Sequence, residues 1–289
     1  MDNRQKKGIA LAVCAAALYA INTPLSKLLL NDIPSTLLAG LLYLGAGLGM
    51  LLVWLFRRCT GKAAAENLLS RAELPYTIAM IVLDIAAPVF LMAGLTRTTA
   101  ANASLLGNFE IVATAVIALC FFCEAVSRRL WLGIFFVTAS CALLSFEDLG
   151  SFRFSVGSLF VLLAAVCWGV ENNCTRKLSD KDPMEIVLLK GVFSGSAAVL
   201  IGLGLGERTD SLPAVLCALL VGLVAYGFSI FVYVYAQRLI GAARTSAYYA
   251  VAPFIGSALS LLLFREIPKV TFLFAILLMA AGAYLSSRD

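Results

Sequence analysis

"LLGNFEIVATAVIALCFF" runs from Leu105 to Phe122, and it is an apolar stretch that holds one carboxylate, Glu110, near its start. The whole chain has the same character: 61% of its 289 residues are hydrophobic, 13% are charged, and its mean hydropathy is +0.94. Soluble globular domains are about 45–50% apolar and about 25% charged. The composition therefore indicates a protein whose solvent is the lipid bilayer, and runs such as this one decide its fold.

Charged residues divide the chain into ten apolar segments of membrane-spanning length. A helix crosses the hydrocarbon core with about 20 residues, or about 17 if it is short. The first segment has the look of a signal peptide, but a second apolar segment follows it instead of a polar domain, so we expect it to be a retained span. The ten expected spans are about 8–29, 36–56, 75–95, 101–122, 130–146, 156–175, 185–205, 213–235, 243–264 and 270–287.

The lysines and arginines indicate how these spans are oriented. Fifteen of them lie at the N-terminus or in the connections on its side of the membrane, and six lie on the opposite side. Basic residues concentrate on the cytoplasmic side. We therefore expect an all-α, multi-pass protein of a bacterial plasma membrane with both termini in the cytoplasm. This requires an even number of spans, and ten fits.

The two halves of the chain share a weak pattern. At an offset of 149 residues the aligned positions are Tyr19 with Trp168, Asn22 with Glu171, Ser26-Lys27 with Thr175-Arg176, and Pro34 with Pro183. Two halves of five spans insert with opposite orientation because five is odd. Such inverted repeats are typical of secondary transporters, whose substrate site lies near mid-membrane between the halves. We expect one five-helix repeat over 1–148 and a second over 149–289.

Four stretches carry a resemblance to a known family: "LYAINTPLSKLLL" (18–30), "AAVCWGVENNCTRKL" (164–178), "NASLLGNFEIVATAVIALCFFCE" (102–124) and "TSAYYAVAPFIGSALSLLLFREIP" (245–268). Over essentially its whole length the chain resembles the EamA-like family of the drug/metabolite transporter superfamily. The resemblance implies a ten-helix inverted-repeat carrier in which spans one to four and six to nine line a central cavity. It also implies a small metabolite as cargo, often an amino acid, frequently moved outward. The chain departs from the family pattern at two positions. The basic residue expected after the first proline is replaced by Leu41, so only the second half keeps one, Lys190. The fourth span has Glu110-Ile111 where the ninth span has Pro253.

Glu110 is the first candidate for a functional role. It lies about ten residues into its span, and at 1.5 Å per residue this places it near the membrane midplane. Ala103, Gly107 and Thr114 share its helix face by their spacing. A carboxylate on such a face could grip a cationic group of a substrate or carry a proton. The alternative is a structural hydrogen bond to a neighbouring helix.

Three further charges, well inside their spans, are candidates, because charged side chains there usually face a cavity or a partner. Glu171 and Lys190 are expected at similar depth, which favours an ion pair or a gate contact over direct substrate contact. Lys190 could also extend its amine to the membrane surface. Asp84 lies mid-span, one turn before the helix-kinking Pro88. We consider Asp84 as a substrate ligand or proton carrier, with a structural role as the alternative.

Polar and aromatic residues complete the candidate cavity. Tyr226, Tyr249 and Trp168 lie far enough from span ends to line it, and aromatic rings there could hold an organic cation by cation–π contact. Their alternative role is packing or contact with the lipid interface. Asn22 matches Glu171 in the other half, so it is a candidate for the opposite gate.

The sequence predicts a transporter and not an enzyme. The chain has no histidine, and most of its eight cysteines lie in or beside apolar runs, where we expect them to act as small packing residues. We expect no cofactor, no metal and no nucleic-acid partner; the expected partners are a small-molecule substrate, the bilayer and protons, with a homodimer compatible with the sequence. The leading hypothesis is an exporter of an amino acid or a related zwitterionic or cationic metabolite. The alternatives are an organic-cation, quaternary-amine or nucleobase permease of the same fold, or a passive channel.

Overall fold

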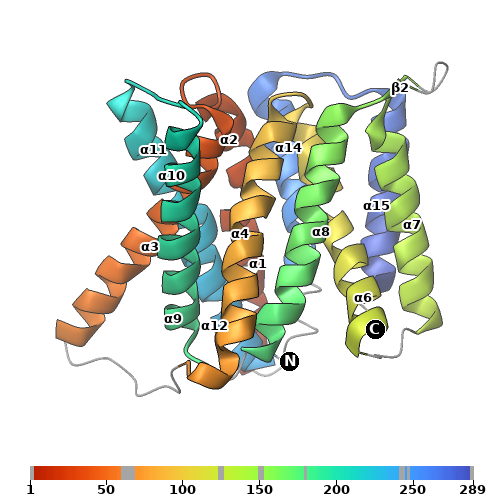
Figure 1. Ribbon diagram of the computed structural model, residues 1–289. Helices are drawn as coiled ribbons and strands as arrows, with labels where there is room; N and C mark the ends of the chain where they lie inside the picture. Colours follow the sequence, from red (N-terminus) through yellow and green to blue (C-terminus); the bar gives the residue numbers. More distant parts are fainter. Residues whose placement is uncertain are drawn as a thin grey trace.

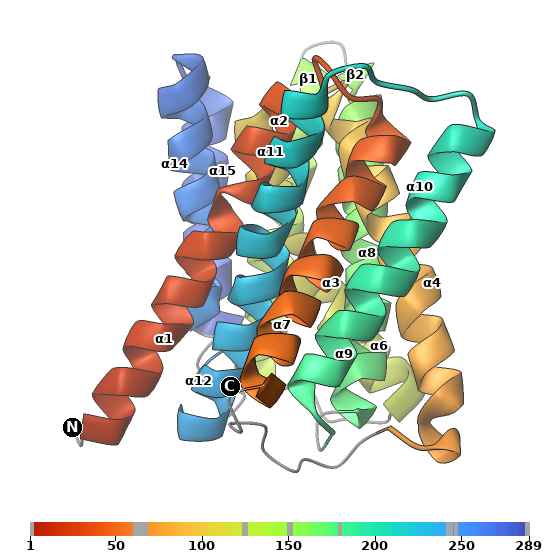
Figure 2. The ribbon, with the colours of Figure 1, turned by 90° about the vertical axis from the view of Figure 1, so that its left-hand side faces the viewer.

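The structure is a computed structural model, and it describes residues 3–59, 69–122, 127–148, 153–178, 181–240, 245 and 248–286. These residues form a bundle of helices that run roughly along one direction (Figures 1 and 2). The short strands β1 (Phe146–Asp148) and β2 (Arg153–Phe154) form an antiparallel hairpin in which Phe146 pairs with Phe154. The expected all-α class therefore holds for the described residues apart from this hairpin.

The helices follow one another with short connections. Those of the first half are α1 (Asn3–Ala20), α2 (Asn22–Leu29), α3 (Ser35–Cys59), the 3-10 turn η1 (Arg71–Glu73), α4 (Leu74–Leu95), α5 (Ala100–Leu106), α6 (Phe109–Phe122) and α7 (Arg128–Ser145). Those of the second half are α8 (Val156–Lys177), α9 (Pro183–Leu189), the π-helical turn η2 (Lys190–Ser194), α10 (Gly195–Gly204), α11 (Leu212–Gly222), the π-helical turn η3 (Leu223–Phe228), α12 (Ser229–Ile240), α14 (Ala252–Phe264) and α15 (Val270–Ser286).

Eight helical segments of the described chain are long and apolar enough to cross a membrane. The expected ninth and tenth spans fall on the shorter helices α14 and α15, and most of residues 241–247, where the ninth span was expected to begin, lie outside the described chain. The beginning of α1 and the end of α15 lie at the same end of the bundle, opposite the hairpin (Figures 1 and 2). Membrane crossing by ten spans, and the side of the membrane on which the termini lie, stay predictions.

The first and fourth expected spans are each two helices instead of one. The first is interrupted at Ile21, between α1 and α2. Pro24 explains this break, because it has no N–H to donate to the carbonyl of Ala20 and its ring crowds that carbonyl. The fourth is interrupted at Gly107 and Asn108, between α5 and α6, so Glu110 lies in the first turn of a new helix.

Close backbone contacts hold α3 between the two helices that contain the π-helical turns. A Cβ atom added to Gly47 of α3 would lie 2.5 Å from the backbone nitrogen of Val192, in η2. One added to Gly222 of α11 would lie 1.9 Å from the carbonyl oxygen of Leu42. Only glycine permits these approaches, and small residues mediate close helix packing in membranes. As a result, a side chain in the middle of α3 can reach both neighbouring helices.

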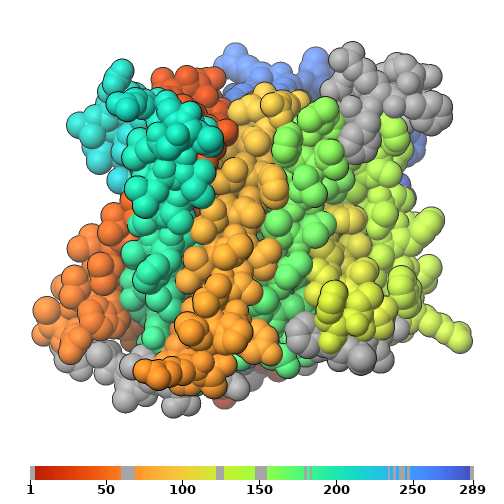
Figure 3. Space-filling view, in the orientation of Figure 1, coloured from red at the N-terminus to blue at the C-terminus, as the bar shows by residue number. Residues whose placement is uncertain are grey.

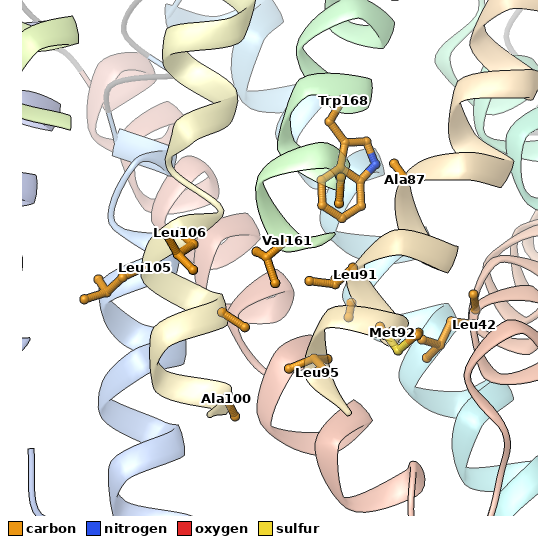
Figure 4. Packing of buried hydrophobic residues seen from close by; sticks show 14 of the residues in the cluster. Leu42, Ala87, Leu91, Met92, Leu95, Ala100, Leu105, Leu106, Val161 and Trp168 are labelled. Atoms are coloured by element: carbon orange, nitrogen blue, oxygen red, sulfur yellow. The ribbon is translucent and has the colours of Figure 1, made fainter. Parts of the chain in front are cut away.

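Apolar side chains fill the space around this central arrangement. Figure 4 shows Trp168 and Val161 of α8 beside Ala87 and Leu91 of α4, and these residues belong to one buried cluster. On the face seen in Figure 3, α4 lies between α10 and α8. The polar residues described next are therefore enclosed by packed helices and not by loops.

Candidate functional site

Lys190, Glu171 and Asp84 form one buried ionic cluster between η2, α8 and α4. The Nζ atom of Lys190 lies 2.5 Å from Oε1 of Glu171 and 3.4 Å from Oδ2 of Asp84. All three residues are buried, with exposed fractions of 8%, 3% and 2%. Charges in the hydrocarbon region are costly unless they are paired or face an aqueous cavity. The cluster gives each charge an opposite partner, but two carboxylates share one ammonium group.

Three neutral donors surround this ionic cluster. Tyr43 Oη, on α3, donates a hydrogen bond to Asp84 Oδ1 at 3.0 Å, and Trp168 Nε1 donates to Tyr43 Oη at 3.3 Å. Thr175 Oγ1 donates to Glu171 Oε1 one turn earlier on α8. Oδ2 of Asp84 has no hydrogen-bond partner among the described residues. The cluster therefore has spare acceptor capacity at Asp84.

A second, uncharged polar group lies beside the ionic cluster. Asn22 Nδ2 donates to Tyr226 Oη at 2.9 Å, and Ser26 Oγ donates to Asn22 Oδ1 at 3.1 Å. The three residues are buried and come from α2 and η3. The ring of Tyr226 lies against that of Tyr43, with centroids 4.9 Å apart. Tyr43 thus connects the ionic cluster with the uncharged group.

Four tyrosines form a chain of ring contacts at the uncharged group. The ring centroid of Tyr19 lies 5.8 Å from that of Tyr226 and 5.9 Å from that of Tyr249. Tyr233 and Tyr249 meet edge-to-face at 4.9 Å. The structure thus brings two expected cavity residues, Tyr226 and Tyr249, into one aromatic cluster through Tyr19. It places Trp168 with the ionic cluster instead.

Glu110 is held by α8 and lies outside both groups. Its Oε1 atom accepts a hydrogen bond of 2.6 Å from Nδ2 of Asn172, which also contacts Thr114 Oγ1 at 3.3 Å. Glu110 and Thr114 therefore do share a helix face, and this face meets α8. Glu110 is only half-buried. The structure shows the hydrogen bond to a neighbouring helix that was the structural alternative for Glu110, and it leaves part of the side chain accessible.

The π-helical turns place two of the candidate residues. Lys190 begins η2, and Tyr226 lies within η3. A π-helical turn adds a residue to the helix and is often found at functional sites. In both helices the irregular turn holds a buried residue with a polar group, Lys190 or Tyr226.

Sequence reasoning missed Tyr43, which contacts three other helices. The sequence signal for Tyr43 was one tyrosine in an apolar span with several glycines. This pattern is as typical of a packed core as of a functional site. The sequence did not predict that Asp84 lies with Glu171 and Lys190, because its depth alone could not reveal that α4, α8 and η2 meet. In the described part of the chain, no group of three His, Cys, Asp or Glu side chains could hold a metal ion.

Comparisons with known proteins agree with a transporter. The model of the EamA-like transporter family matches residues 6–146 and 155–288. A protein of Methanothermobacter thermautotrophicus named an uncharacterized transporter is 24% identical over 279 residues, covering 91% of this chain and 81% of the relative. A solved crystal structure is similar in fold with a TM-score of 0.69 and 18% identity, covering 96% of this chain and 94% of that one.

Proposed function

Because the chain belongs to the EamA-like transporter family, we propose that this membrane transporter moves a small polar metabolite with a cationic or zwitterionic group, with amino acids as the leading class. The observation that carries this proposal is the excess of negative charge inside the bundle. Asp84, Glu171 and Glu110 supply three carboxylates, and Lys190 supplies one ammonium group. Such groups are retained inside a membrane protein mainly for function.

We further propose alternating access between two inverted repeats around this site. The repeat-related residues Asn22 and Glu171 each accept a hydrogen bond from a hydroxyl four residues later, which supports the repeat. The basic residues favour cytoplasmic termini in a plasma membrane. Outward transport is proposed from the resemblance to the family.

Proton coupling is part of the proposal and rests on Glu110 and Asp84. Both carboxylates lie inside the bundle, and Glu110 is partly accessible. A carboxylate that binds a proton on one side and releases it on the other can couple a gradient to transport of a cation. A passive channel of the same fold would show no such coupling.

The tyrosine cluster favours a second candidate function. Tyr19, Tyr226, Tyr233 and Tyr249 offer aromatic faces close to one another, and such faces attract quaternary ammonium groups. A permease for quaternary amines is therefore the alternative that has structural support. A nucleobase permease, which would stack its cargo on the same rings, stays a prediction from the sequence.

The test is a thermal-shift screen of the purified protein, followed by uptake into liposomes. The ligands are amino acids, polyamines, quaternary amines and nucleobases. We expect one class to raise the unfolding temperature of the wild type and to be transported, and this shift to be lost in Asp84→Asn or Tyr249→Ala. A ligand that stabilises and is transported equally in all three proteins would contradict the proposed site.

A further inference from the structure

Two carboxylates of the ionic cluster share one ammonium group. Asp84 and Glu171 approach the same Nζ atom, and the formal charges of the three side chains add up to −1. Each carboxylate can accept several hydrogen bonds, and an ammonium group can donate three. Among the described residues, Lys190 supplies one ammonium group to this site, and the two carboxylates have acceptor positions for further donors.

The distances show which carboxylate is less well satisfied. Glu171 Oε1 accepts from Lys190 at 2.5 Å and also from Thr175. Asp84 accepts from Tyr43 at Oδ1, but its Oδ2 atom lies 3.4 Å from the ammonium and has no hydrogen-bond partner in the described chain. The exposed fraction of Asp84 is 2%, so this oxygen is buried and receives no hydrogen bond from the described residues.

We propose that this cluster is the ammonium subsite of the transporter, and that the primary ammonium group of the substrate takes the place of Lys190 between Asp84 and Glu171. The inference rests on the proposed function and narrows its substrate class. A primary ammonium carries N–H donors, which the carboxylates require. A quaternary ammonium has none, so it cannot replace Lys190 and would bind only through aromatic faces.

Lys190 is suited to such an exchange. Its ammonium is a compact charge on a flexible four-carbon stem, so it can leave the carboxylates without moving the helix. The residue begins the π-helical turn η2, where the helix is already irregular. The tyrosine rings, in contrast, lie at centroid distances of 4.9–5.9 Å from one another and offer aromatic faces but no carboxylate to accept from an N–H group.

The experiment is chemical rescue of Lys190→Ala with small amines. Removing the lysine leaves two buried carboxylates without a counter-charge, which strongly destabilises a protein. We expect ethylammonium chloride to raise the unfolding temperature of Lys190→Ala in a saturable way, and tetramethylammonium chloride at equal ionic strength to leave it unchanged. A ligand that binds only the folded state stabilises it in proportion to the logarithm of its concentration.

A matched control is Lys181→Ala, which removes a lysine that pairs with Glu73 at 3.4 Å near the surface. This variant keeps the ionic cluster, so its response to the two amines should equal that of wild type. In the double variant Asp84→Asn, Lys190→Ala, the ethylammonium concentration needed for half of the maximal stabilisation should rise at least tenfold. Equal effects of the two amines, or no effect of either on Lys190→Ala, would overturn the proposal.

Wild type and Glu171→Gln supply a second measurement if Lys190→Ala does not fold. Wild type should be stabilised by ethylammonium but not by tetramethylammonium. In Glu171→Gln one carboxylate faces one ammonium, so ethylammonium should no longer stabilise this variant more than tetramethylammonium does. If ethylammonium still stabilises it more, the proposal is wrong. If the protein transports amino acids but neither amine stabilises any variant, the proposed ammonium subsite is wrong and the proposed function still holds.

Discussion

Tyr43 and Tyr226 lie in ring contact, with centroids 4.9 Å apart, and so join the charged and the uncharged polar groups of the bundle. The hydroxyl of Tyr43 donates to Asp84, and that of Tyr226 accepts from Asn22. Since these partners belong to α4 and α2, a movement at either group changes the packing at the other. A tyrosine on α3 is thus the physical link between the residues of the candidate site.

Replacing Tyr43 by phenylalanine tests this link. The variant keeps the ring contact but removes the donor to Asp84 and the acceptor for Trp168. Hydrogen bonds to charged groups contribute about 1.5–3 kcal/mol, and we expect Tyr43→Phe to lower the free energy of unfolding by this amount. Denaturation in mixed micelles measures it. The control is Tyr76→Phe at an exposed tyrosine, and an equal loss in both variants would contradict the role of the Tyr43 hydroxyl.

The repeat-related hydroxyls of Thr175 and Ser26 should contribute differently to the free energy of unfolding, because only that of Thr175 donates to a charged group. Thr175 donates to the carboxylate of Glu171, whereas Ser26 donates to the amide of Asn22. Charge-assisted hydrogen bonds are roughly twice as strong as neutral ones. We expect Thr175→Val to cost about 1.5–3 kcal/mol and Ser26→Ala about 0.5–1.5 kcal/mol in the free energy of unfolding. Equal costs in chemical denaturation would show that Glu171 is not held as a charged acceptor.

Gly47 should not tolerate alanine. Its added Cβ would lie 2.5 Å from the backbone nitrogen of Val192, so α3 and η2 would have to separate. Overpacking typically costs about 1–3 kcal/mol, and we expect a loss of this size in the thermal unfolding of Gly47→Ala. The control is Gly204→Ala, where a Cβ meets nothing within 4 Å. This second variant should be neutral or slightly stabilised, since alanine favours helix by up to about 1 kcal/mol over glycine.

Much of the fold could be predicted from the sequence because lipid leaves few alternatives to helices of about 20 apolar residues. The break at Ile21 could also have been inferred, since Pro24 cannot bond to the carbonyl of Ala20. The break at Gly107 and Asn108 could not, because no proline marks it. The π-helical turns at Lys190 and Tyr226 leave no trace in an apolar run, whose periodicity is too weak to register one added residue.

For the candidate site, too, some features could be predicted from the sequence and others could not. Similar depth was enough to predict that Glu171 and Lys190 lie close together, since both lie near the same end of their spans. The position of Asp84 in the same cluster depends on which helices are neighbours, and spacing along one chain does not encode this. Tyr43 was missed for a related reason: its importance lies in contacts to other helices and not in its residue type.

The two carboxylates proposed for proton coupling should be separable by the pH dependence of transport. Glu110 accepts a hydrogen bond from neutral Asn172, whereas Asp84 faces the ammonium of Lys190. If Glu110 carries the proton, Glu110→Gln retains the contact with Asn172 but cannot titrate. We therefore expect it to exchange substrate across liposome membranes at a rate that an imposed pH gradient no longer changes. Asp84→Asn should instead reduce substrate affinity at every pH, because it removes an anionic ligand. Counterflow of the transported ligand measures substrate exchange, and uptake driven by a pH gradient measures coupling, so the two assays together distinguish the roles of Glu110 and Asp84. A pH-gradient response in Glu110→Gln equal to that of wild type would contradict the assignment of Glu110.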